Sequence, residues 1–150
     1  MKQELQMKFW KRFSFFDPKG DIKRTLIPFG FECGNGWFDL LWKLCESIDI
    51  ILKEEKTKDF EVLQVKEKFA GLRFYVTAAT DKIWKLIEKA EGKSYKTCEE
   101  CGARGTLHSS GHWLKTLCRK CAKESRKGQH RYYKIRKMER MKKRFNRRTK

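Results

Sequence analysis

Apolar residues near the start of the chain follow a helical period. Residues 2–16 predict an amphipathic helix, because their large apolar side chains recur every three or four positions, at Leu5, Phe9, Phe13 and Phe16. The segment 17–20 ends this helix, since proline and glycine interrupt it. We expect the helix to pack on the core, and the alternative is a helix that docks a partner through exposed aromatic residues.

A second helix is predicted between about residues 37 and 52, where the helical pattern is strongest. It has one broad apolar face, made of Trp37, Leu40, Leu41, Leu44, Cys45, Ile48 and Leu52. Cys45 is expected to be a buried small hydrophobic residue on this face. The preceding residues 28–36 hold one proline and three glycines, which predicts an irregular, apolar connection. Cys33 lies in that connection, and the sequence assigns it no role.

Two runs rich in β-branched and aromatic residues, 60–66 and 72–77, predict a β-hairpin that turns near Gly71. Apolar and polar residues alternate in the second run, so one face is expected to pack on the preceding helix and the other to face water. The alternative is that aromatic and basic residues of the hairpin stack nucleic-acid bases. Three side chains suit that role: Phe69, Arg73 and Tyr75.

A third helix is predicted over residues 80–92, with Gly92 just past its end. The order helix, helix, hairpin, helix predicts a small α+β domain over residues 1–92. After it we expect a zinc-binding module, residues 93–127, and a basic helical tail, residues 128–150.

Four of the six cysteines form two Cys-x-x-Cys pairs separated by sixteen residues. Two such pairs suit a tetrahedral four-thiolate zinc site. The surrounding segment holds few apolar residues, so bound zinc is expected to supply the free energy that orders it. We therefore predict one structural Zn²⁺ per chain, bound by Cys98, Cys101, Cys118 and Cys121.

Two zinc folds fit the residues around these cysteines. A knuckle, a hairpin and a helix would form a treble-clef module, and a zinc ribbon is the alternative; the run without helix breakers from Cys121 to Gly128 favours the treble clef. His108 and His112 are alternative ligands. A treble-clef nuclease would need an acidic residue near its histidines, and none is found, so we predict no enzyme and no small-molecule substrate. The nuclease residues would be His108, His112, His130 and Asn146.

Positive charge is concentrated late in the chain. The formal net charge is +18; residues 1–92 hold 17 Lys/Arg against 15 Asp/Glu, net +2, whereas residues 93–150 hold 20 against 4, net +16. Such a field attracts polyanions, because each neutralised phosphate releases condensed counterions. Nucleic acid, DNA or RNA, is the leading partner. An acidic protein surface or an acidic membrane surface could satisfy the same charge.

A basic helix with an apolar stripe is predicted over residues 129–145. If about six to eight cations meet phosphates, log affinity should fall with log salt at a slope of about −5 to −7. Phosphate contacts carry little sequence information, so sequence preference should be weak. The predicted nucleic-acid contacts are Lys115, Arg119, Lys120, Lys123, Arg126, Lys127, Arg131, Lys134, Arg136, Lys137, Arg140, Lys142, Lys143, Arg144, Arg147 and Arg148.

The first residues offer neither the apolar core of a signal peptide nor a membrane span. This predicts an intracellular, cytoplasmic protein, and we expect no membrane partner. Thiols stay reduced in that compartment, so the paired cysteines favour metal over disulfides.

Three stretches match a pattern of known sequences: residues 36–41, GWFDLL; residues 65–75, VKEKFAGLRFY; and the Cys-x-x-Cys-Gly of 98–102 with Thr-Leu-Cys at 116–118. In these the chain resembles a group of short phage-encoded and bacterial proteins of unassigned function. The resemblance covers about residues 30–122 and implies one continuous zinc-containing unit, but no activity. In that group the last ligand is often His, whereas this chain has Cys121.

The cysteine segment alone is also similar to the four-cysteine finger of the DksA/TraR class of RNA-polymerase regulators. That class carries an acidic-tipped helical hairpin before its finger, where this chain has the α+β domain. The sequence thus predicts a zinc-stabilised, phage-related nucleic-acid-binding protein. The alternative is an interaction protein that inhibits or redirects a host nucleic-acid machine, such as a transcription complex.

Overall fold

The fold combines helices with two small antiparallel sheets, which confirms the predicted α+β class. The computed structural model describes residues 1–110, 113–127 and 138–139. The chain divides into two compact units, Met1–Cys118 and Arg119–Lys150. The domain boundaries expected after residues 92 and 127 stay predictions.

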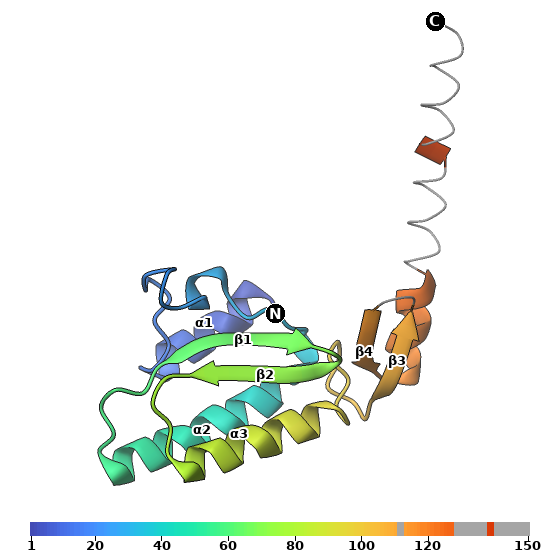
Figure 1. The fold of residues 1–150 in the computed structure, drawn as a ribbon. Helices are drawn as coiled ribbons and strands as arrows, with labels where there is room; N and C mark the ends of the chain where they lie inside the picture. Colours follow the sequence, from blue (N-terminus) through green and yellow to red (C-terminus); the bar gives the residue numbers. More distant parts are fainter. Residues whose placement is uncertain (111–112, 128–137, 140–150) are drawn as a thin grey trace, which may run out of the picture. The chain divides into compact units, whose positions relative to one another are not determined.

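Buried residues between Phe9 and Ala90 form one hydrophobic core cluster. It lies among the helices and the first hairpin of the unit Met1–Cys118, whose backbone is drawn in Figure 1. Helix α3 (Asp81–Ser94) packs against α2 (Phe38–Glu55) and against strand β2 (Gly71–Val76). Strand β2 pairs with β1 (Val62–Lys68) in the predicted hairpin. Short 3-10 helices occupy Ile27–Phe29 (η1) and Asn35–Trp37 (η2).

The first helix is shorter than the sequence predicts. Helix α1 (Gln3–Arg12) is followed by Phe13 in an extended conformation, with φ −121° and ψ 117°. The predicted extension to residue 16 is wrong, because the carbonyl of Phe15 instead accepts a hydrogen bond from the N–H of Val62 at 3.0 Å. The turn after Phe13 buries both Phe15 and Phe16, whereas neighbours in a helix point about 100° apart. Phe9 is buried, so the helix packs on the core as expected.

The hairpin has one buried and one outer face. Val65 pairs with Phe74 and both are buried, whereas Lys66 pairs with Arg73 on the opposite face. This alternation confirms the expected core-facing side, because side chains along a strand point alternately to its two faces. The turn consists of Phe69 and Ala70, next to the predicted position.

Both edges of the hairpin are covered. Along β1, Val62, Leu63, Val65 and Glu67 exchange backbone hydrogen bonds with the segment 15–32. Along β2, side chains of α3 accept from the strand: Leu72 N–H donates to Ser94 Oγ at 2.8 Å, and Phe74 N–H donates to Glu91 Oε1 at 3.2 Å. These backbone groups, which a lone two-stranded sheet would expose, are therefore bonded within the chain.

The third helix runs further than predicted. Gly92 was expected beyond its end, but α3 continues to Ser94. The Ser94 hydroxyl accepts from Leu72 N–H and donates to the carbonyl of Glu91 at 2.5 Å, so this extra turn is held against β2. The helix end is set by that contact, which overrides the weak helical preference of glycine.

The cysteine segment contains a second hairpin. Strand β3 (Thr106–Ser110) pairs antiparallel with β4 (Trp113–Leu117). In the unit Arg119–Lys150, residues 119–127 are helical. The basic helix predicted over residues 129–145 lies outside the described residues, apart from residues 138–139, which are helical.

Candidate metal centre

Four cysteine sulfurs converge. The Sγ atoms of Cys98, Cys101, Cys118 and Cys121 all lie within 4.8 Å of one another. The Sγ atoms of Cys101 and Cys118 are 3.7 Å apart, far beyond the length of a disulfide bond. A tetrahedral ion with metal–sulfur bonds of about 2.3 Å would hold its sulfurs about 3.8 Å apart. The donor set therefore fits a metal ion at the four predicted cysteines.

The first cysteine pair lies on a tight turn. Cys98 N–H donates to the carbonyl of Ala103 at 2.7 Å, and Gly102 N–H donates to the carbonyl of Cys98 at 2.9 Å. Gly102 has φ +78°, a conformation that side chains disfavour. This explains the glycine directly after the second ligand. Cys98 is fully buried and Cys101 is exposed.

The turn rests on the glycine-rich loop before α2. Gly36 N–H donates to the carbonyl of Glu99 at 2.7 Å, and Trp37 Nε1 donates to the carbonyl of Thr97 at 2.9 Å. A Cβ atom on Gly36 would lie 2.3 Å from the carbonyl oxygen of Cys98, and one on Gly34 would lie 2.2 Å from that of Glu99. The loop therefore needs both glycines to accept the cysteine turn.

The sequence predicted this loop only as an irregular connection. The signal for its role was the spacing Gly34-x-Gly36 directly before a buried tryptophan, since neighbouring glycines permit close backbone approach. The spacing alone does not reveal which distant segment makes that approach.

Glu99 ties the cysteine turn to its surroundings. Its Oε1 accepts from Gly34 N–H at 2.9 Å, and its Oε2 lies 3.4 Å from Lys115 Nζ. Burial raises the pKa of the Glu99 carboxyl above its ordinary value, against the opposing effect of Lys115. Burial alone would lower the pKa of Lys115, but Glu99 and Glu100 raise it. Lys115 is thus charge-compensated within the unit.

A buried hydroxyl joins β4 to the first hairpin. Thr116 Oγ1 donates to the carbonyl of Ala70 at 2.8 Å, and the carbonyl of Thr116 accepts from Glu99 N–H at 2.9 Å. Thr116 and Ala70 are both fully buried. One residue between the two cysteine pairs therefore connects the cysteine turn to the turn between β1 and β2.

Four thiolates explain what a metal would do here. Structural zinc is held by four Cys or His ligands in a closed tetrahedron, and such a site keeps no position for water or substrate. An ion bound by all four cysteines would crosslink the chain from residue 98 to residue 121. Its contribution would be to the stability of the fold.

The histidine alternatives are only partly described. His108 Nε2 lies 3.3 Å from Thr106 Oγ1, and His108 is not among the four clustered donors. The remaining residues of the nuclease alternative, His112, His130 and Asn146, lie outside the described residues. That alternative stays untested.

The predicted nucleic-acid contacts are distributed over both units. Lys115 forms ion pairs with Glu99 and Glu100. Five others are exposed on the helical residues 119–127: Arg119, Lys120, Lys123, Arg126 and Lys127. The rest lie outside the described residues: Arg131, Lys134, Arg136, Lys137, Arg140, Lys142, Lys143, Arg144, Arg147 and Arg148.

The two other cysteines are buried. Burial raises the pKa of the Cys33 thiol to about 12 and that of Cys45 well above its ordinary value. Both thiols are therefore protonated at neutral pH, because ionisation without solvent is costly. Cys45 is the buried small residue that its helix face predicted.

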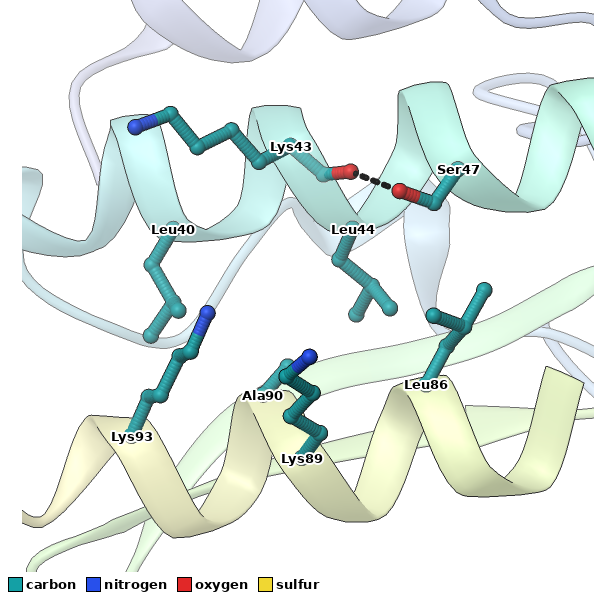
Figure 2. Close-up of a pocket in the computed structure, with 8 residues that line it drawn as sticks. All are labelled: Leu40, Lys43, Leu44, Ser47, Leu86, Lys89, Ala90 and Lys93. Carbon is teal, nitrogen blue, oxygen red and sulfur yellow. Dashed lines mark hydrogen bonds between the residues drawn. The ribbon is translucent and has the colours of Figure 1, made fainter.

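A shallow groove between α2 and α3 was not anticipated. Figure 2 shows apolar side chains from both helices facing one another, with lysines beside them. Its volume is about 130 Å³, close to the size of a cavity that holds benzene. The floor and rim consist of Leu40, Leu44, Leu86 and Ala90 with Lys43, Ser47, Lys89 and Lys93.

No known protein family, no curated protein and no solved structure matches this chain. The resemblances to phage-encoded proteins and to the DksA/TraR finger therefore remain expectations from the sequence. Within the described part of the chain, every helix is too short or too polar to cross a membrane.

Proposed function

We propose that the chain is a zinc-stabilised nucleic-acid-binding protein. The observation that carries this proposal is the helical run 119–127, which begins directly after Cys118 and exposes five cations against Glu124. Exposed Arg and Lys side chains on one short helical run can contact successive phosphates. Zinc is the proposed metal, because four thiolates in a closed set are typical of structural zinc.

The proposed metal module is of treble-clef type. Its support is the order of the elements: a cysteine turn, the β3–β4 hairpin, and helical residues that carry Cys121. The helix would begin at the second cysteine pair, where its N-terminal N–H groups favour thiolates. The ion would then anchor the basic segment to the α+β unit.

Charge neutralisation tests the nucleic-acid contacts. Replacing Lys123, Arg126 and Lys127 with glutamine should lower the salt slope of duplex DNA binding by about 2 to 3, because each lost phosphate contact removes about 0.9. A matched control replaces three exposed lysines of the other unit, Lys11, Lys19 and Lys23. Fluorescence anisotropy at several salt concentrations gives the slope.

Removing residues 126–150 should reduce the slope further, since it deletes most of the predicted contacts. Equal slopes for the wild type, the tail-less chain and the triple variant would contradict the proposal. An equal reduction of the salt slope in the triple variant and in its control would show a non-specific effect of charge instead of a basic binding segment.

A second candidate function is binding of an acidic protein segment, and the groove of Figure 2 favours it. The lysines at its rim form no ion pair among the described residues, and the groove has an apolar floor. An apolar side chain flanked by carboxylates would complement both features. Changing Lys89 and Lys93 to glutamate should abolish binding to such a partner and leave the salt slope on DNA unchanged.

A further inference from the structure

The turn between β1 and β2 has an unusual backbone. Phe69 and Ala70 have φ values of 53° and 65°, and Lys56 is the other non-glycine residue with positive φ in the described part of the chain. A two-residue hairpin turn with two positive φ values is normally made of residues such as Asn-Gly, which tolerate them. Phenylalanine does not gain from this conformation, so its presence calls for another explanation.

The surroundings hold this backbone in place. Glu67 Oε1 accepts from Ala70 N–H at 2.6 Å, and Thr116 Oγ1 donates to the carbonyl of Ala70 at 2.8 Å. A Cβ on Gly71 would lie 2.4 Å from the ring of Tyr95, so that ring covers the strand start. The turn is therefore fixed by three contacts, and none of them uses the ring of Phe69.

The ring of Phe69 is presented to solvent. Phe69 is 66% exposed although Ala70 beside it is fully buried. An exposed phenylalanine on a fixed backbone gains nothing from the core, and its rigid position lowers the entropy lost on binding a partner. These properties are expected of a residue that contacts a binding partner without first changing its backbone conformation.

Basic and aromatic side chains continue along the hairpin from this ring. Lys68 Nζ lies 5.4 Å from the centroid of the Phe69 ring, and Lys66 Nζ lies 5.4 Å from that of Tyr75. Tyr75 is 40% exposed. Because Lys66, Lys68 and Tyr75 occupy alternate strand positions, they share the outer face of the hairpin.

A third ring extends this surface. Tyr95 is 40% exposed, and its hydroxyl accepts from Arg73 Nη2 at 3.1 Å. Arg73 is also 3.7 Å from Glu91 Oε2, which offsets its charge. Lys66 and Lys68 form no ion pair among the described residues, so they are the cations available to a ligand of this surface.

We propose that this hairpin surface stacks the unpaired bases of single-stranded nucleic acid on Phe69, Tyr75 and Tyr95. Exposed bases stack on aromatic rings, while nearby cations contact the backbone phosphates. A duplex buries its base faces, so it could use the lysines but not the rings. A purely apolar protein segment would use the rings but not the lysines. The inference rests on the proposed function and adds the class of nucleic acid that is preferred.

The zinc module takes part in this surface indirectly. Thr116, two residues before the ligand Cys118, holds the carbonyl of Ala70, so ordering of the cysteine segment supports the turn that presents Phe69. Thr116 is a positioning residue here, because it contacts the turn and not the bases.

The test compares two variants of the full-length zinc-loaded chain. Phe69→Asn should keep the turn, because asparagine tolerates positive φ, and should weaken binding to a fluorescein-labelled 12-nucleotide dT or rU strand by about 5-fold to 100-fold. Phe29→Ala is the matched control, since Phe29 is 67% exposed and has no positive φ. It should bind as the wild type does.

Duplex DNA of the same length distinguishes stacking from charge. The wild type should prefer single strands, and Phe69→Asn should lose that preference. The salt slope of duplex binding should be the same for both proteins. Unchanged single-strand binding by Phe69→Asn, or equal loss on the duplex, would overturn the inference and leave the proposed function standing. Failure of the wild type to bind any strand in a salt-dependent way would overturn both.

A spectroscopic readout reports stacking directly. A single 2-aminopurine within the dT strand should be quenched on binding to the wild type and less so with Phe69→Asn at saturating protein. Equal quenching in both would overturn a stacking role for Phe69. The dT and rU arms differ in the 2′-hydroxyl and in the C5-methyl group of the base, so they compare DNA-type with RNA-type strands, and stronger binding in either arm supports the inference if it depends on Phe69.

Discussion

At the scale of single residues, Gly34 and Gly36 leave the space that the backbone of the cysteine turn occupies. A side chain on Gly36 would meet backbone atoms of Cys98, Cys101 and Gly102 at 2.3–2.5 Å, and backbone cannot swing aside as a flexible side chain can. Gly92 on α3 differs, because a Cβ there would meet nothing within 4 Å.

We therefore expect Gly36→Ala to destabilise the zinc-loaded protein by about 1–3 kcal/mol or more, as overpacking does. Gly92→Ala should instead stabilise it by about 0.5–1 kcal/mol, because alanine loses less entropy in a helix. Urea unfolding measures both. Equal effects of the two substitutions would show that the contacts at Gly36 are not as close as described.

Cys33 gives a pH dependence with a definite sign. Burial raises the pKa of its thiol from 9.0 to about 12 in the folded chain. Above pH 9 the unfolded chain releases this proton and the folded chain does not, so the unfolding free energy should fall by about 1.4 kcal/mol per pH unit until about pH 12. Below pH 9 the thiol has no effect on the slope.

Urea unfolding of the zinc-loaded protein between pH 8 and pH 10.5 checks this expectation. The unfolding free energy of Cys33→Ala should fall less steeply with pH than that of the wild type above pH 9, while the two slopes are the same near pH 7. Parallel curves over the whole range would mean that Cys33 ionises freely in the folded state.

At the scale of elements, periodic segments were predictable and their junctions were not. Helices α2 and α3 follow from the helical period of their apolar residues, and the first hairpin follows from alternating apolar and polar residues. Both patterns are local in the sequence. The end of α1 depends on a bond from Phe15 to Val62, and the glycine loop depends on Glu99. Local patterns carry no information about partners some fifty or sixty residues away.

The metal ligands were predictable for a different reason. Their spacing is a chemical requirement of the ion, so Cys98, Cys101, Cys118 and Cys121 could be identified without the fold. Phe69 could be named as a residue beside basic neighbours, but its left-handed backbone could not be foreseen, since phenylalanine rarely adopts it.

The contact between the two hairpins can be tested at Thr116. Thr116→Val keeps the shape of the side chain but leaves the buried carbonyl of Ala70 without its donor, which should cost about 1–3 kcal/mol. Ser47→Ala is the control, because among the described residues its hydroxyl bonds to the carbonyl of Lys43 at an exposed position of α2. Thermal unfolding with zinc present compares them, and similar small effects would show that the Thr116 contact contributes little.

At the scale of the whole molecule, removal of the proposed zinc ion should alter the structure beyond the cysteines. Chelation, or Cys118→Ser, should abolish protection from hydrogen exchange over residues 97–118 and reduce it at Gly36 and Trp37, which bond to Glu99 and Thr97. Elemental analysis of the reduced wild type should give one zinc per chain. Protection that is unchanged by chelation, or protein that purifies without metal, would contradict the structural role of zinc.

The covered edges of the first hairpin restrict how any partner can approach it. A peptide strand cannot extend this sheet, because the segment 15–32 occupies one border and Ser94 and Glu91 occupy the other. A partner therefore cannot bind by backbone pairing and would have to contact the side chains of the outer face. Edge pairing is closed to aggregation as well as to complex formation, so a partner of this hairpin would have to be recognised by its exposed rings and cations.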